Sequence, residues 1–436
     1  MILNERRYPL RGENFLVEVW LPYGKTEVCV RVPTKDLLHM IEPNEKAAAK
    51  NPQTEIERAL ANPLGTSRLA ETVKPSSKVA LVLRNSDTST NHMMVSAVLK
   101  ELNSAGVADE NVEVIVACDP LRSFSTKKQM PLFGEKLSSR VHITWHNCET
   151  SDCVPVGKTS RGTNVNLNSA FVDADVRIIL GTVEPHLFAG YNGGPEIIVP
   201  GVSNIETVKA NFSLALDKKA KRGVLKENPV HEDMVEAAEL AKVDFSLNAV
   251  RNSSFEIAKA FAGDVNKAFE EAVRLADEVC RATVAARADI VFVSPGGFPF
   301  DGTLFDSVQC LDVAAEVVKR GKPIVLVAEC MDGHGNIEFY EAISKFQEPK
   351  TLQRSLKKTF GIGGLVAHRF MKASQSSKIF LVSTLPDYYV SKCSSMKVAR
   401  TANEAYRYAS DVAGKNAKVS FISYGNLTIP SIKASD

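Results

Sequence analysis

The sequence lacks the long apolar runs and the one-sided charge that would tie it to a membrane or to nucleic acid. No run reaches the length of a membrane span, and the N-terminal stretch MILNERRYPLRGENF has no continuous apolar core of a signal peptide. Lys and Arg number 53 against 51 Asp and Glu, without a basic cluster interleaved with aromatics. We therefore expect no nucleic acid partner, no membrane association and a cytoplasmic location.

Paired cysteine spacing is also missing. The eight cysteines are scattered from Cys29 to Cys393, which favours a reducing compartment over a disulfide framework. The stretch His142 to Cys148, with Cys153 downstream, has zinc-ligand residue types but matches no standard spacing. We therefore interpret it as strand and loop residues that happen to include histidine, and a metal for this protein stays unknown. At 44% apolar and 24% charged residues the chain is an ordinary globular protein, and 436 residues indicate two domains.

Short apolar runs alternate with longer helical stretches along the chain. Runs such as VALVL, RIIL, DIVFVS and PIVLVA are typical of buried parallel strands. The alternation predicts an α/β protein made of two α/β domains with mainly parallel sheets. We place the domain boundary near Val284, giving domains 1–284 and 285–436, and expect an interdomain cleft lined by motifs at strand ends.

The most informative segment is GTVEPHLFAGYNGGPEIIVPG, from Gly181 to Gly201. It follows a predicted strand, so Glu184 and His186 should emerge at the carboxyl end of that strand, where open α/β sheets bind ligands. Gly193 and Gly194 allow positive φ and close backbone approach to a ligand. The segment therefore predicts a binding site, although a connection with a half-buried structural histidine has the same composition.

This segment resembles the signature loop of the nickel-pincer lactate racemase family, which contains a similar EPHFFAGFSGG stretch. Five further motifs follow the order and approximate spacing of that family: NPLGTSRL, HEDMVEA, AFAGD, GGFPFD and DGHG. The resemblance spans nearly the whole chain. It implies racemisation or epimerisation of 2-hydroxy acids, in which a pincer cofactor takes a hydride and returns it to the opposite face. Two histidines act as acid and base, a lysine holds the cofactor covalently and a third histidine ligates nickel.

The family pattern is largely absent at these positions. His186 matches one acid/base histidine, but Leu121 stands at the position of the other. Glu196 replaces the cofactor-bearing lysine, and Phe212 replaces the nickel-binding histidine. Because a carboxylate cannot form the thioamide link of the family, we expect no covalent cofactor attachment, and the cofactor itself stays unknown.

The residues around these positions have changed as well. Asp87 stands where the resemblance places an arginine that faces the cofactor phosphate, with Arg84 nearby. In the second half, FDSVQ from Phe305 to Gln309 replaces residues that contact cofactor or substrate in the family. These changes remove positive charge, so a phosphorylated cofactor or a simple carboxylate should bind less readily.

The remaining polar residues are of the types used for acid/base work or hard-metal binding. We expect acid/base chemistry from His186, Glu196 and Asp119. The expected ligand-binding residues lie at strand ends or in loops: Arg84, Asp87, Arg122, Glu184, Gly193, Gly194, Asp306, Asp332 and His334.

Three functions stay open. The first is a racemase or epimerase of a 2-hydroxy acid or sugar acid with a repurposed site. The second is a different acid/base or metal-assisted enzyme. The third is a non-catalytic homologue that binds a small molecule, since charged residues in a crevice can simply pair with one another. The substrate and the oligomeric state cannot be read from these residues.

Overall fold

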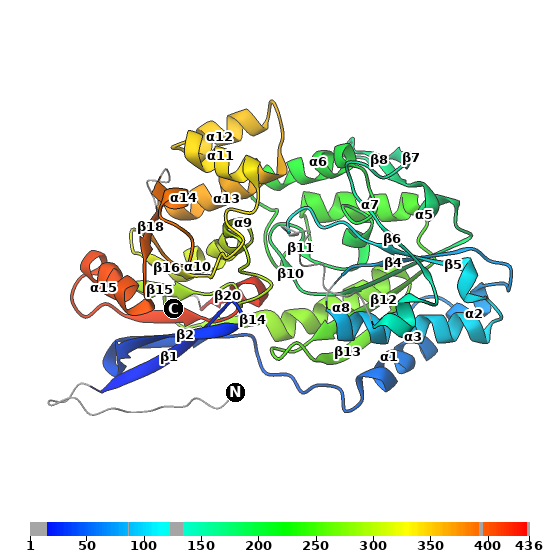
Figure 1. The fold of residues 1–436 in the computed structure, drawn as a ribbon, viewed down its shortest axis with the longest axis horizontal. Coiled ribbons are helices and arrows are strands. Elements are labelled where there is room, and N and C mark those ends of the chain that lie inside the picture. Colours follow the sequence, from blue (N-terminus) through cyan, green and yellow to red (C-terminus); the bar gives the residue numbers. More distant parts are fainter. Residues whose placement is uncertain (1–14, 86, 123–133, 392–395, 434–436) are drawn as a thin grey trace. The chain divides into compact units, whose positions relative to one another are not determined.

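The computed structural model describes residues 15–85, 87–122, 134–391 and 396–433, and these form two compact units (Figure 1). The central unit contains Asn44–Pro120 and Phe124–Val279. The C-terminal unit contains Cys280–Asp436 together with Met1–Pro43 and Leu121–Ser123. The early residues belong to the C-terminal unit because a strand at Leu37–Ile41 pairs with one at Val419–Ile422, a long-range pairing that the sequence pattern did not indicate.

The central unit is built on a six-stranded sheet in the order β13-β12-β9-β4-β5-β6. Only the β12–β13 pair is antiparallel, and the other neighbours are parallel. The strands of this sheet are β4 (Val79–Leu83), β5 (Val112–Val116), β6 (His142–Trp145), β9 (Val176–Thr182), β12 (Phe245–Arg251) and β13 (Ile257–Gly263). Two small antiparallel pairs accompany it: β7 (Cys153–Lys158) with β8 (Asn164–Asn168), and β10 (Pro185–His186) with β11 (Gly190–Tyr191).

Helices cover both faces of this sheet. The helices of the central unit are α1 (Pro52–Ala61), α2 (Leu69–Thr72), α3 (Thr88–Ser104), α4 (Glu135–Ser138), α5 (Ser169–Asp173), α6 (Ile205–Ser213), α7 (Pro229–Ala241) and α8 (Val265–Cys280). Helices α1 and α3 share one apolar core with Leu180 and its neighbours on the sheet. Gly181, the next residue along β9, faces the opposite side of the sheet. A Cβ atom at this position would lie 2.9 Å from Cδ1 of Ile197. The loop after β9 therefore folds back over the other face of the sheet.

The C-terminal unit contains a second six-stranded sheet, in the order β18-β17-β16-β15-β19-β3, with every pair parallel. Its strands are β3 (Leu37–Ile41), β15 (Ile290–Val293), β16 (Ile324–Val327), β17 (Ile379–Val382), β18 (Met396–Ala399) and β19 (Val419–Ile422). The four central strands are buried on both faces, which explains their continuous apolar sequences. A short parallel pair, β14 (Arg281–Val284) with β20 (Ile429–Ile432), completes the strands near the C-terminus.

One face of the C-terminal sheet packs against a hairpin and a helix. The hairpin consists of β1 (Leu16–Tyr23) and β2 (Thr26–Pro33), and its buried valines share an apolar core with α15 (Ala402–Ala413). The other helices of this unit are α9 (Leu304–Ser307), α10 (Leu311–Val317), α11 (Ile337–Lys345), α12 (Pro349–Leu356), α13 (Ile362–Gln375) and α14 (Tyr388–Ser391). The mixed α/β architecture with mainly parallel sheets agrees with the sequence-based prediction.

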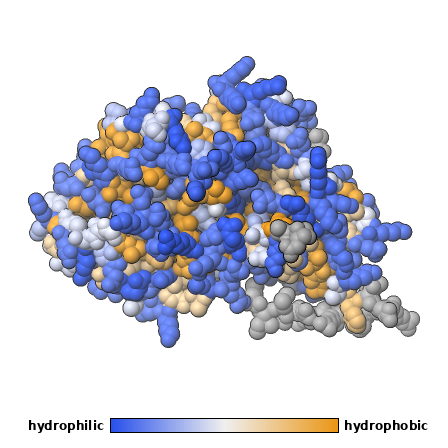
Figure 2. All heavy atoms as spheres, turned by 180° about the vertical axis from the view of Figure 1, so that it is seen from behind, coloured by the Kyte–Doolittle hydropathy of each residue, from blue (hydrophilic) through white to orange (hydrophobic). Residues whose placement is uncertain are grey.

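The face of the molecule seen in Figure 2 is covered mostly by hydrophilic residues, interrupted by smaller apolar areas. Among the residues that the structure describes, none of the helices combines the length and the apolar character needed to cross a bilayer.

Helix α13 carries a histidine in the apolar interior. His368 is 1% exposed, and within the described part of the chain neither ring nitrogen has a hydrogen-bond partner. Burial, with the nearby charges of Lys372 and Arg369, lowers the pKa of His368 to about 4. The folded state therefore binds this proton less readily than the unfolded state, so His368 must cost stability as the pH falls from 6.5 towards 4.

Replacing His368 by leucine should therefore stabilise the protein more at pH 5 than at pH 7.5. One pKa unit corresponds to about 1.4 kcal/mol of unfolding free energy. The lowered pKa of His368 can therefore reduce the stability of the folded protein at acidic pH by at most about 3 kcal/mol. Urea unfolding of both proteins at the two pH values measures the difference. The exposed His92 offers a control, as His92→Gln. An equal stability difference between H368L and wild type at both pH values would contradict the prediction.

Candidate functional site

Four charged side chains gather at one edge of the central sheet. Arg84 directly follows β4, Asp119 follows β5, Glu184 follows β9, and Arg251 ends β12. These four strands are neighbours in the order β12-β9-β4-β5 and run parallel, so their carboxyl ends meet at the same edge. This is the edge at which open α/β sheets bind ligands.

Arg84 lies between two carboxylates. Its Nε is 3.2 Å from Oε2 of Glu196, and its Nη2 is 3.5 Å from Oδ2 of Asp119. The side chains of Arg84 and Glu196 are only 10% and 5% exposed, whereas Asp119 is 19% exposed. The Glu196 carboxylate also accepts the backbone N–H of Gly193 at 3.1 Å. The structure thus brings together three of the residues that the sequence singled out.

Burial and pairing act in opposite directions on the protonation of this cluster. Burial raises the pKa of the Glu196 carboxyl, and the negative charge of Asp119 raises it further. The positive charge of Arg84 acts to lower this pKa but does not cancel the rise. Burial acts to lower the pKa of Arg84, but Glu196 and Asp119 outweigh it, so the guanidinium stays charged. The raised pKa of the Glu196 carboxyl is of the kind that suits a general acid.

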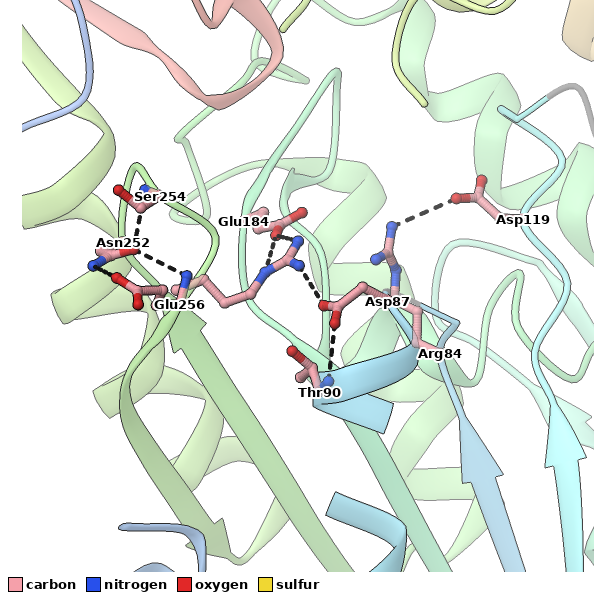
Figure 3. A network of polar contacts seen from close by, with 9 residues as sticks. Arg84, Asp87, Thr90, Asp119, Glu184, Asn252, Ser254 and Glu256 are labelled. Carbon is pink, nitrogen blue, oxygen red and sulfur yellow. Dashed lines mark hydrogen bonds and ion pairs between the residues drawn. The ribbon is translucent and has the colours of Figure 1, made fainter. Parts of the chain in front are cut away.

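A second arginine, Arg251, holds two more of the expected residues. Its Nε donates to Oε1 of Glu184 at 3.1 Å, its Nη2 bonds to the same oxygen, and its Nη1 donates to Oδ2 of Asp87 at 2.6 Å. Figure 3 shows Glu184 and Asp87 on either side of this guanidinium group. Asp87 also accepts the backbone N–H of Thr90 at 2.9 Å and so caps α3.

Arg251 was not among the residues expected from the sequence. Its signal was present in the run FSLNAVRN, where polar and apolar residues alternate before an arginine, but β12 was not identified as a strand of the sheet. Once β12 is placed beside β9, Arg251 must reach the same edge as Glu184.

His186 lies just beyond the cluster, on the short strand β10. Its Nδ1 accepts the backbone N–H groups of Ala189 at 2.9 Å and Phe188 at 3.3 Å. The imidazole meets the ring of Phe188 edge-on with centroids 4.7 Å apart, and Phe188 in turn packs edge-on against Phe212 at 4.8 Å. His186 is 7% exposed, and Phe212 is fully buried.

Two glycines shape the loop that carries Glu196. Gly193 has φ of 85° and Gly194 has φ of 51°, conformations that favour glycine. A Cβ at Gly194 would also lie 2.6 Å from the ring of Phe269, and the Gly194 N–H donates to Oδ1 of Asn248 at 3.2 Å. Both glycines are therefore needed for the fold of the loop, independently of any ligand.

The other expected residues belong to the C-terminal unit. Asp306 accepts the Thr303 hydroxyl at 2.6 Å, at the start of α9. The ring of His334 stacks on Tyr340 with centroids 5.0 Å apart, and the guanidinium of Arg122 lies 4.5 Å from the ring centre of Phe300. Asp332 is exposed in the turn after β16. The structure thus divides the candidate residues between two units.

Fold and site together define a two-domain α/β protein with histidine, arginine and carboxylate side chains at the carboxyl ends of parallel strands. Residues 23–223 match the model of the lactate racemase N-terminal domain, and residues 283–429 match that of the lactate racemase C-terminal domain. The chain belongs to the lactate racemase family.

Individual relatives agree with this assignment. The chain is 29% identical over 426 residues to a lactate racemase of Thermoanaerobacterium thermosaccharolyticum, covering 94% of this chain and 98% of the relative. It is 28% identical over 423 residues to a lactate racemase of Lactiplantibacillus plantarum, covering 94% and 99%. The structure of the apoprotein from the first organism superposes with a TM-score of 0.85 at 27% identity, covering 95% of this chain and 100% of that one. A Thermotoga maritima protein shares the fold with a TM-score of 0.68 at 16% identity, covering 89% and 100%.

The residues present do not fit the pincer cofactor that the family resemblance implies. Glu196, at the position of the attachment lysine, is buried and paired with Arg84. Phe212, at the position of the nickel histidine, is packed against Phe188. Asp87, at the phosphate-facing position, bonds to Arg251. Within the described residues, no three His, Cys, Asp or Glu side chains converge to hold a metal ion.

Asp87 should act as an internal substitute for a bound anion. Asp87→Asn keeps an oxygen that can cap α3 but removes the negative charge beside Arg251. Because a hydrogen bond to a charged group contributes about 1.5–3 kcal/mol, inorganic phosphate should bind about tenfold more tightly to D87N than to wild type. Isothermal titration at low ionic strength measures this.

The control for this measurement is Glu206→Gln, which also removes one negative charge from the central unit. The Glu206 side chain is 73% exposed, and its Oε1 lies 3.4 Å from Nζ of Lys209. A D87N protein that binds phosphate no better than wild type and E206Q would contradict the prediction.

Proposed function

We propose that the protein is a racemase or epimerase of a polyhydroxylated 2-hydroxy acid, such as a sugar acid, rather than of lactate. Membership of the lactate racemase family supports the isomerase class. The proposal of a polyhydroxylated substrate is based on one observation, which is that both arginines of the site are already paired. Arg84 contacts two carboxylates, and Arg251 contacts two others.

Charge balance favours hydroxyl groups over a simple carboxylate in this cluster. Two arginines face four carboxylates, Asp87, Asp119, Glu184 and Glu196. A monocarboxylate such as lactate would have to displace one of these acidic partners from a buried guanidinium. Ligand hydroxyls, by contrast, donate to carboxylates, and each such contact is charge-assisted. The cluster therefore suits a ligand with several hydroxyl groups.

The proposal assigns roles to the candidate residues. His186, Glu196 and Asp119 exchange or hold protons at the reacting hydroxylated carbon, with Glu196 as the group whose pKa burial raises. The proposed ligand-binding residues are Arg84, Asp87, Glu184, Gly193 and Gly194 in the central unit, and Arg122, Asp306, Asp332 and His334 in the C-terminal unit. We also propose a cytoplasmic location, which the scattered spacing of the cysteines in the sequence supports.

The second candidate function is a non-catalytic binding homologue. The mutual pairing of the charged residues favours it, since a site whose charges neutralise one another is stable without a reaction to perform. Both functions predict affinity for a polyhydroxylated acid, but only the first predicts turnover.

Turnover and its chemical route can be measured together. Protein purified from its native source is incubated in deuterium oxide with gluconate, and in parallel with lactate, and the products are followed by NMR and chiral chromatography. We expect epimerised gluconate and unchanged lactate. Deuterium at C2 would indicate proton exchange at carbon, whereas its absence would indicate transfer without exchange with water. Binding of gluconate without epimerisation would favour the binding homologue, and racemisation of lactate alone would overturn the substrate class.

Restoring two family residues should not restore lactate racemisation. Glu196→Lys and Phe212→His together recreate the attachment and nickel positions, but Leu121 still lacks an acid/base group and Asp87 still faces any cofactor phosphate. The double mutant, supplied with the pincer cofactor, should racemise lactate no faster than wild type. A lysine beside Arg84 also places like charges in a buried site, so folding is checked by circular dichroism with E196Q/F212H as the matched control. Lactate racemisation at a rate comparable to that of family members would refute this interpretation.

A further inference from the structure

The charged cluster of the central unit holds both of its arginines in ion pairs. Arg84 and Arg251 each contact two carboxylates, so neither guanidinium can take the carboxylate of a ligand without giving up one of these partners. A sugar acid nevertheless has one carboxylate in addition to its hydroxyl groups. The acid group of such a ligand therefore needs a positively charged partner outside this cluster.

Arg122, the third arginine among the candidate residues, is not neutralised in this way. In the part of the chain that the structure describes, Arg122 pairs with no carboxylate. Its side chain is half-buried, and Cζ lies 4.5 Å from the ring centre of Phe300. Stacking on an aromatic ring uses a face of the guanidinium, whereas the five N–H donors lie in the guanidinium plane. The contact with Phe300 therefore leaves hydrogen-bond donors of Arg122 for an acidic ligand.

The surrounding contacts fix the place of Arg122. The backbone oxygen of Leu121, the preceding residue, accepts Nε2–H of Gln309 at 2.7 Å, and Leu121 is only 5% exposed. Phe300 is also 5% exposed, and its N–H donates to the backbone oxygen of Gly297 at 2.7 Å. An arginine that is held by its backbone and by a buried ring loses less conformational freedom when it binds a ligand.

These contacts place Arg122 at one edge of the C-terminal sheet. Leu121 and Arg122 belong to the C-terminal unit, although the strand before them, β5, belongs to the central unit. Phe300 and Gln309 follow the carboxyl end of β15 and precede α10, the helix after which the chain enters β16. All strand pairs of this sheet are parallel, and open parallel sheets bind ligands at the carboxyl ends of their strands.

We propose that Arg122 binds the carboxylate of the acid ligand and so selects an acid over a neutral polyol. A guanidinium offers a carboxylate two parallel N–H donors, a geometry that a lysine ammonium does not reproduce. The inference deepens the proposed function, on which it rests for the identity of the acid. It also separates the two kinds of ligand group, with hydroxyls for the paired cluster and the carboxylate for Arg122.

Calorimetric titration of the full-length protein with gluconate and with sorbitol tests this role. Sorbitol has the same chain of hydroxyl groups but no carboxylate. Because a charge-assisted contact is lost, Arg122→Gln should bind gluconate about tenfold more weakly than wild type, with no change for sorbitol. Arg122→Lys keeps the charge without the planar fork and should lie between them. Arg320→Gln removes an exposed charge from the same unit and should bind both compounds as wild type does. Equal gluconate affinity of R122Q and wild type would overturn the inference.

A second measurement needs no variant. Phenylglyoxal, which modifies guanidinium groups, is added to wild-type protein, and the modified arginines are located by peptide mass spectrometry. Gluconate should slow the modification of Arg122 several-fold and leave Arg320 unchanged, whereas sorbitol should protect neither. Modification of Arg122 at the same rate with and without gluconate would contradict the proposed role.

These outcomes separate the inference from the isomerase proposal. Protection of Arg122 without epimerisation of gluconate would leave the carboxylate-binding role standing and favour the binding homologue. Epimerisation of gluconate by R122Q with the KM of wild type would overturn the role of Arg122 and leave the isomerase proposal standing.

Discussion

The buried pair of Arg84 and Glu196 is the interaction on which the candidate site depends. Arg84 directly follows a central strand, so its position is set by the sheet, while Glu196 lies in a glycine-rich loop that must fold back to reach it. The Glu196 carboxylate also accepts the Gly193 N–H, which ties the turn of the loop to the same charge. Removing Arg84 would leave the buried Glu196 carboxylate without its ion-pair partner, and the loss of one partner of such a pair costs about 3–5 kcal/mol. The pair therefore constrains which residues the loop can carry.

This constraint explains why the departures from the family pattern occur together. A lysine at position 196 would repel Arg84, so a glutamate there is compatible with the arginine next to β4 and a lysine is not. Asp87 likewise fits Arg251, which would otherwise be a buried guanidinium with Glu184 as its partner. The exchanged charges thus form a consistent set of pairs.

Much of the fold could be predicted because parallel strands buried on both faces have continuous apolar sequences. The run VALVL coincides with β4, and the runs before Glu184 and after Ala288 correspond to β9 and β15. The edge strand β3 could not be found in this way, since LLHMI is short and pairs with β19, almost four hundred residues later in the chain. Sequence periodicity contains no information about such pairing, so it could not assign residues 15–43 to the C-terminal unit.

The residues of the site could be predicted from the sequence only where the strand before them could be recognised. Residues that directly follow an apolar run, such as Arg84 and Glu184, were identified because their strands were identified. Arg251 was not identified, because β12 alternates polar and apolar residues instead of forming a continuous apolar run. The pairing of Arg251 with Asp87 was therefore not expected either. The hydrogen bonds that Nδ1 of His186 accepts from the backbone lay beyond any sequence pattern, because they depend on how the loop folds. A histidine in a family motif indicates that an imidazole is present, but only the fold of the loop determines which backbone groups bind its ring.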